Sequence, residues 1–149
     1  GLPSGRQAAD ADGGGEFLVK TLIAVASFSG ETDVTDTEAT VVRNLVEAEL
    51  GKTGRFRLVE RARLNFILEE KRLSVSGLST GECAVALGRA SGAELAVFGS
   101  VSRDKNGYLI TVRLADVSSA VILRSETVIA AEDYLFRDAA RRLAAVLSR

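Results

Sequence analysis

The sequence predicts a mixed α/β domain with three layers, in which helices cover both faces of a five-stranded sheet. Residues 21–27 (TLIAVAS) form a continuous apolar run, which is typical of a central strand buried on both faces. Helical patterns separate this strand from the next two strands, and such crossovers imply parallel pairing. Three further strand patterns follow with short turns between them, which favours an antiparallel meander. The predicted element order is β-α-β-α-α-β-β-β-α, and right-handed crossovers give the spatial order 2-1-3-4-5.

A first helix is expected from Asp36 or Thr37, either of which can cap it, to about Thr53. Glu38 lies in its first turn, where the helix dipole favours a carboxylate. The polar residues 29–36 before the helix are expected to form a loop. The predicted apolar face of the helix consists of Val41, Val42, Leu45, Val46 and Leu50.

A short strand and a second helix are predicted after this first helix. Residues 55–60 alternate, so that Phe56 and Leu58 point to one side of the sheet and Val59 points to the other. The helix that follows at once is expected to turn Leu64, Ile67 and Leu68 inward.

Ser79 and Glu82 fit the capping-box pattern at the start of a third helix, in which each side chain bonds the other residue's backbone N–H. This helix is expected to end at Gly92 and to bury Cys83, Leu87 and Ala90. A final helix over about 132–147 is expected to bury Phe136, Ala140, Leu143 and Leu147.

The meander consists of the predicted strands 94–103, 108–117 and 121–130. Asn106 and Gly107 predict a tight turn between the first two strands, because both residues tolerate a positive φ. The last strand, if it lies at an edge of the sheet, is a surface on which a partner or another copy can pair.

The chain divides at about residue 16. Residues 1–16 hold the only proline, five of the glycines and almost no apolar side chains, so burial cannot offset the entropy of ordering them. We interpret 1–16 as a flexible N-terminal tether and 17–149 as one α/β domain.

Composition excludes several classes of function. The formal net charge of −1 predicts no strong attraction to nucleic acid. The chain has no histidine, which removes the commonest general base and metal ligand, and its single cysteine precludes an internal disulfide. No apolar run approaches the roughly 18 residues that a membrane-spanning helix needs.

Two short motifs resemble catalytic or phosphate-binding sites without meeting their requirements. Residues 77–81 read G-x-S-x-G, but the string joins two predicted helices, and no histidine is present to accept the proton of Ser79. Residues 51–53 (GKT) end a helix, whereas a phosphate-binding loop precedes one. We therefore predict no catalytic residue, no cofactor and no metal site, and we do not expect an enzyme.

A longer constellation resembles a known family. A strand ending in Val59-Glu60-Arg61 is followed at once by an amphipathic helix and a small-residue turn at Gly77. Further on come Gly88, then Gly92-Ala93-Glu94-Leu95, then Gly99-Ser100 and the strand 108–117. This order is similar to the periplasmic domain of the curli secretion family CsgG and its relatives, among them LpoB, a lipoprotein that activates a penicillin-binding protein. The resemblance spans residues 22–130.

The resemblance implies a fold and a compartment. It implies a periplasmic domain of the cell envelope, anchored to the outer membrane through an N-terminal lipid that this chain does not contain, with envelope proteins as partners. The two long amphipathic hairpins of the curli channel have no counterpart in this sequence, so no transmembrane hairpins and no pore are expected. The family-motif residues are expected to shape the fold and not to contact a partner: Glu60, Arg61, Leu64, Gly77, Gly88, Gly92 and Gly99.

Three functions remain open at this point. The first is a non-enzymatic protein-interaction domain, an accessory in secretion, adhesin or cell-wall assembly. The second is a ring-forming structural component, since the curli relatives assemble as homo-oligomers. The third is a nucleic-acid-binding module, because the predicted topology is similar to that of anticodon-binding domains; the net charge argues against it.

Overall fold

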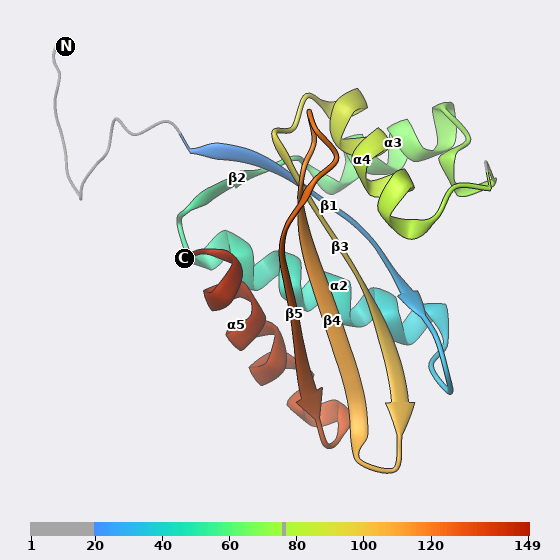
Figure 1. Ribbon diagram of the computed structural model, residues 1–149, viewed down its shortest axis with the longest axis vertical. Helices are drawn as coiled ribbons and strands as arrows, with labels where there is room; N and C mark the ends of the chain where they lie inside the picture. Colours follow the sequence, from blue (N-terminus) through green and yellow to red (C-terminus); the bar gives the residue numbers. More distant parts are fainter. Residues whose placement is uncertain (1–19, 76) are drawn as a thin grey trace, which may run out of the picture.

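The computed structural model describes residues 20–75 and 77–149, and it contains one five-stranded mixed sheet with helices on both faces (Figure 1). The predicted tether and the boundary at residue 16 lie outside the described residues. The elements, in chain order, are β1 (Thr21–Gly30), α2 (Asp36–Lys52), β2 (Phe56–Leu58), α3 (Arg61–Glu70), the 3-10 turn η1 (Leu73–Val75), α4 (Thr80–Ser91), β3 (Leu95–Asp104), β4 (Gly107–Asp116), β5 (Ile122–Ala130), the 3-10 turn η2 (Asp133–Leu135) and α5 (Phe136–Leu147).

The strand order β2-β1-β3-β4-β5 confirms the predicted topology. β1 is parallel to both of its neighbours, and β3, β4 and β5 form the antiparallel meander. β2 is very short and pairs with only the first three residues of β1, Thr21 to Ile23. One edge of the sheet is therefore only partly closed by a strand.

β1 is buried on both faces, as its apolar run predicts. Ile23 and Val25 face one core, which α2 and α5 cover. Ala24 and Ala26 face a second core, which α3 and α4 cover. Each core takes alternate residues of the same strand, so β1 is the element around which both helical layers pack.

β1 is longer than predicted, because it continues through part of the expected loop to Gly30. The pairing with β3 shifts by one residue between Val25 and Phe28, which marks a β-bulge. The bulge returns Phe28 to the core that Val25 faces and leaves Ser27 exposed. The strand thus keeps its large apolar side chain inside after the extra residue.

The N-cap of helix α2 lies one residue before the first predicted cap, Asp36, and two residues before the second, Thr37. Thr35 is its N-cap and forms a reciprocal capping box with Glu38. Asp36, one of the two predicted caps, instead accepts a hydrogen bond from the N–H of Gly30 at 3.1 Å. Val41 is 47% exposed, so its predicted place on the apolar face is wrong.

The third predicted helix, α4, begins with the expected capping box between Ser79 and Glu82 and ends at Gly92. Its buried face is turned slightly from the predicted one, because Cys83 and Ala90 are only half-buried. The residues that are buried are Ala84, Val85, Leu87, Gly88 and Ser91. α5 buries the four residues predicted for it, but it starts at Phe136, after the 3-10 turn.

Two glycines of the family motif lie where a side chain would collide with a neighbour. A Cβ on Gly88 of α4 would lie 2.6 Å from Cγ2 of Val117. A Cβ on Gly99 of β3 would overlap the carbonyl oxygen of Thr111 and would lie 3.1 Å from the ring of Phe28. The space beside Gly99 is thus taken by β4 and an aromatic ring.

Gly99→Ala is expected to lower the free energy of unfolding by about 3 kcal/mol, because the new methyl group meets the backbone of β4, which cannot move without breaking the sheet. The matched control is Gly51→Ala in α2, where the nearest atom to a new Cβ is Cδ1 of Leu58 at 3.5 Å. That change is expected to stabilise the domain by about 0.5–1 kcal/mol, since alanine favours the helix. Urea unfolding measures both, and equal effects would contradict the steric argument.

Candidate functional site

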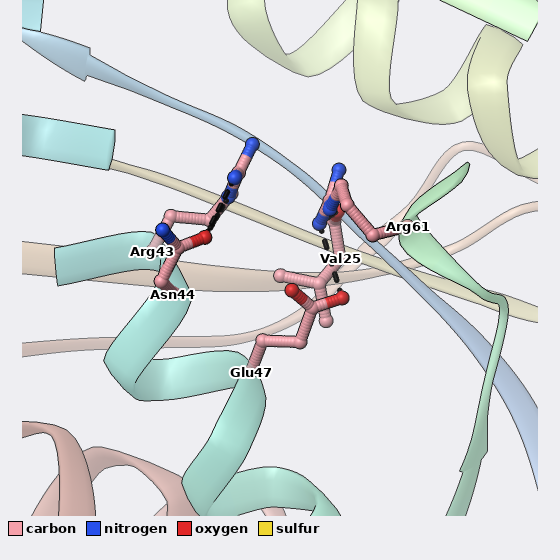
Figure 2. A network of polar contacts seen from close by, with 5 residues as sticks. All are labelled: Val25, Arg43, Asn44, Glu47 and Arg61. Atoms are coloured by element: carbon pink, nitrogen blue, oxygen red, sulfur yellow. Dashed lines mark hydrogen bonds and ion pairs between the residues drawn. The ribbon is translucent and has the colours of Figure 1, made fainter. Parts of the chain in front are cut away.

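Arg61 completes the hydrogen bonding of β1 at the point where β2 ends. The N–H of Val59 donates to the carbonyl oxygen of Ile23 at 3.0 Å, which is the last backbone bond between these segments. The chain then turns into α3, and Nη2 of Arg61 donates to the carbonyl oxygen of Val25 at 2.6 Å (Figure 2). A side chain therefore bonds the carbonyl that the next residue of a longer β2 would have bonded.

The same nitrogen links the sheet edge to helix α2. Nη2 of Arg61 lies 3.1 Å from Oε2 of Glu47, and both side chains are mostly buried, at 24% and 18% exposure (Figure 2). The two contacts of Nη2 together join α3, β1 and α2 at one point. Directly after β2, the side chain of Arg61 can reach both of the other elements.

The electrostatic balance around Arg61 is incomplete. Its Nε and Nη1 are buried and have no hydrogen-bond partner among the described residues. The pKa of neighbouring Arg43 is lowered, first by burial and then by the positive charge of Arg61, while Glu47 opposes this effect. Arg61 is therefore the guanidinium that pairs with Glu47, whereas Arg43 donates to Oδ1 of Asn44 and feels the charges of both.

The other motif residues lie at a helix end, in the second core and at turns. Glu60 is the N-cap of α3, but its side chain makes no capping hydrogen bond. Leu64 is fully buried in the second core. Gly77 and Gly92 have φ values of 79° and 77°, which L side chains rarely adopt. We propose that these residues, with Gly88 and Gly99, act on the fold and not on a ligand.

A groove follows the part of β1 that β2 leaves uncovered. Among the described residues, no strand pairs with residues 25–30 of β1 on that side. A cavity of about 380 Å³ lies there between α2 on one side and α3, η1 and α4 on the other. The residues that line the cavity include Ser27, Phe28, Asp36, Thr40, Leu78 and Cys83.

Side chains close both ends of this open stretch of strand. Arg61 bonds the carbonyl of Val25 at one end, and Asp36 bonds the N–H of Gly30 at the other. The strand edge between them faces the groove and has the length of a short peptide segment. An extended chain can add to such an edge as a further strand and place alternate side chains in the groove.

The sequence did not point to this groove. Arg61 was identified, but its partners Val25 and Glu47 are 36 and 14 residues away. The sequence pattern predicts only a helix cap for Asp36 and gives no signal for Thr40. The one available signal is the polar run 29–36 after an apolar strand, which is typical of a loop.

The described residues contain no group of three or more histidine, cysteine, aspartate or glutamate side chains placed to hold a metal ion. Over the same residues, no helix has both the length and the apolar character needed to cross a membrane. The prediction that the chain has no catalytic, cofactor or metal residues stays a prediction.

Arg61→Ala is expected to lower the free energy of unfolding by about 2 kcal/mol, because it removes charge-assisted bonds to Val25 and Glu47 in a mostly buried site. Arg57→Ala on the exposed side of β2 is the control, and its expected change is within about 0.5 kcal/mol. Arg61→Lys should restore part of the loss, since lysine can donate to the same oxygens. Urea unfolding that gives equal losses for Arg61→Ala and Arg57→Ala would refute this account.

Several solved structures have a similar fold. The C-terminal domain of LpoB from Escherichia coli superimposes with a TM-score of 0.59 and 23% identity, over 77% of this chain and 85% of that chain. The same domain from Salmonella enterica gives a TM-score of 0.62 and 21% identity, over 77% of this chain and 86% of that one. A PelC dodecamer from Paraburkholderia phytofirmans gives 0.53 and 14% identity, over 87% and 88%. At these identities the similarity establishes a shared fold.

The family itself is established by sequence. A comparison with curated protein sequences finds no match. Residues 13–108, which include β1 to β3 and the Glu60-Arg61 motif, match the family described as the curli production assembly/transport component CsgG. The chain, with its Arg61-capped sheet edge and two helical layers, therefore belongs to the CsgG family.

Proposed function

We propose that this chain is a non-enzymatic interaction domain of the cell envelope, which docks on another envelope protein. Membership of the CsgG family supports the compartment and the accessory role, because that family is named for curli production, assembly and transport. The shared fold with LpoB is consistent with the same assignment. We place the domain in the periplasm, held at the outer membrane by an N-terminal lipid anchor, as an accessory in secretion, adhesin or cell-wall assembly.

The open edge of β1 is the observation that carries this proposal. It offers unpaired strand backbone beside a cavity of about 380 Å³, which is a suitable site for an extended segment of a partner protein. The exposed Leu78 would contact apolar side chains of that segment, and the polar wall at Asp36 and Thr40 would face its backbone or polar groups. Docking by shape and backbone pairing needs no reacting group.

A ring-forming structural component is the second candidate. Two of the similar structures are PelC dodecamers, which shows that this fold occurs in large closed assemblies. Light scattering on the full chain separates the two candidates, because a ring former is expected to give a particle of many copies.

The prediction that nucleic acid is not a partner is untested by these comparisons and stays a prediction.

Thr40→Arg is expected to abolish capture of an envelope partner, because the exposed Thr40 lines the groove and an arginine there would fill it. The matched control is Val41→Arg, which makes a similar change at the next residue of α2, on a side that does not line the groove. Pull-down with cross-linking from an envelope extract measures both. Equal capture by the two variants would rule out the groove, and recovery of cytoplasmic proteins alone would rule out the proposed function.

Cys83 provides an internal probe of the same groove. Burial raises the pKa of its thiol, so alkylation should be slow at neutral pH and should accelerate as the pH rises and the thiolate forms. Adding the captured partner should slow the alkylation of wild-type protein at any pH and should leave the rate unchanged in Thr40→Arg. Mass spectrometry follows the reaction, and an unaltered rate in wild type with partner bound would argue against groove binding.

A further inference from the structure

Strand β5 forms the other edge of the sheet, as predicted for the last strand. It pairs with β4 on one side over Ile122 to Ala130, and it is the outermost strand in the sheet order. The side chain of Arg142 reaches the carbonyl oxygen of Ile129 at 3.5 Å, so the peptide groups of Ile129 face away from β4. Because strand residues alternate, the peptide groups of Thr127 and Ser125 face the same free edge.

The sequence around Ser125 is self-complementary in charge. Arg124 and Glu126 flank it, and both side chains lie on the α5 face of the strand, the face that also holds Val128. Neither residue takes part in an ion pair within the described part of the chain. Among the residues that the structure describes, Arg124 donates only to the carbonyl oxygen of Arg149, at 3.1 Å.

We propose that two copies of this chain pair along β5, antiparallel, about a two-fold axis at Ser125. In this register the two Ser125 residues lie opposite each other and exchange backbone hydrogen bonds through their outward-facing peptide groups. Arg124 of each copy then lies opposite Glu126 of the other, so two ion pairs form across the axis. The contact is isologous and closes at two copies, with one continuous ten-stranded sheet.

Exposed apolar side chains support the same register. Leu123 and Ile129 of β5 are 53% and 54% exposed, which is unfavourable for an isolated edge strand. A β-bulge shifts the pairing with β4 at Leu123, so the regular alternation of β5 runs from Arg124 to Ala130. The axis at Ser125 lies within this regular part and brings Leu123 of one copy near Thr127 of the other. The backbone bonds nearest the axis are those of Ser125, so the contact between Arg142 and Ile129 is kept.

Charge also explains why antiparallel pairing centred on Ser125 is more favourable than other ways of pairing two copies along β5. Parallel pairing in register would place Arg124 against Arg124 and Glu126 against Glu126, and like charges directly opposite each other are destabilising. Moving the axis by one residue, to Glu126, would leave Arg124 opposite Val128. Of these three arrangements, only the one centred on Ser125 places each Arg124 opposite a Glu126 of the other copy, which gives two ion pairs.

This pairing is independent of the proposed function. It uses the β5 edge, whereas the groove lies along β1 at the opposite side of the sheet, so one chain can take part in both contacts. It also differs from a ring, since two-fold pairing of one edge cannot continue beyond a dimer.

The test is sedimentation velocity of the full chain over a concentration series. Wild type is expected to show a concentration-dependent dimer. Arg124→Glu alone and Glu126→Arg alone are each expected to raise the dimer dissociation constant by about tenfold or more, because four like charges then meet at the axis. The double variant, and an equimolar mixture of the two single variants, should recover the dimer, because each restores opposite charges.

Arg57→Glu on β2 is the matched control, since it makes the same charge change at the opposite edge, and it should dimerise like wild type. Ser125→Pro, which removes an outward-facing N–H, should be monomeric with unchanged far-UV circular dichroism. A wild type that stays monomeric at every concentration would overturn the proposal. Single charge variants that dimerise like wild type, a mixture that does not recover the dimer, or a particle larger than a dimer would do the same.

Discussion

The peptide carbonyl of Val25 is bonded by the side chain of Arg61 where a longer strand would otherwise bond it. This single contact lets β2 stop after three residues and lets α3 turn away to cover the second core. It also fixes α2 in place, because Glu47 shares the same nitrogen. The open stretch of β1, and hence the groove, exists because a side chain ends the ladder at this point.

The two cores on either side of β1 differ in the size of their side chains. The core under α2 and α5 takes Ile23, Val25 and Phe28 from the strand, whereas the core under α3 and α4 takes Ala24 and Ala26. Small side chains on that face allow the helices to approach the sheet closely, in keeping with the glycine contacts of α4. The groove lies at the sheet edge between these two layers, so its walls come from both of them.

Much of the fold could be predicted from local pattern. The buried strand, the capping box at Ser79 and the meander each leave a clear periodic or capping signature, and chirality then fixes the strand order. Thr35 was missed because three adjacent residues can all cap a helix, and only the tertiary bond from Gly30 to Asp36 decides among them. The groove was missed because its walls come from distant segments, so no local spacing encodes it.

The bulge in β1 changes how the strand tolerates variation in length. Before the bulge the odd-numbered residues face α2 and α5, and after it the even-numbered Phe28 does. Deleting the extra residue, Ser27, would restore the regular alternation and leave Phe28 facing α2 and α5. In related sequences, the stretch between Val25 and Phe28 should therefore be the place where β1 can lose one residue and keep both cores, whereas a one-residue change in the regular part of the strand would turn every later side chain to the other face.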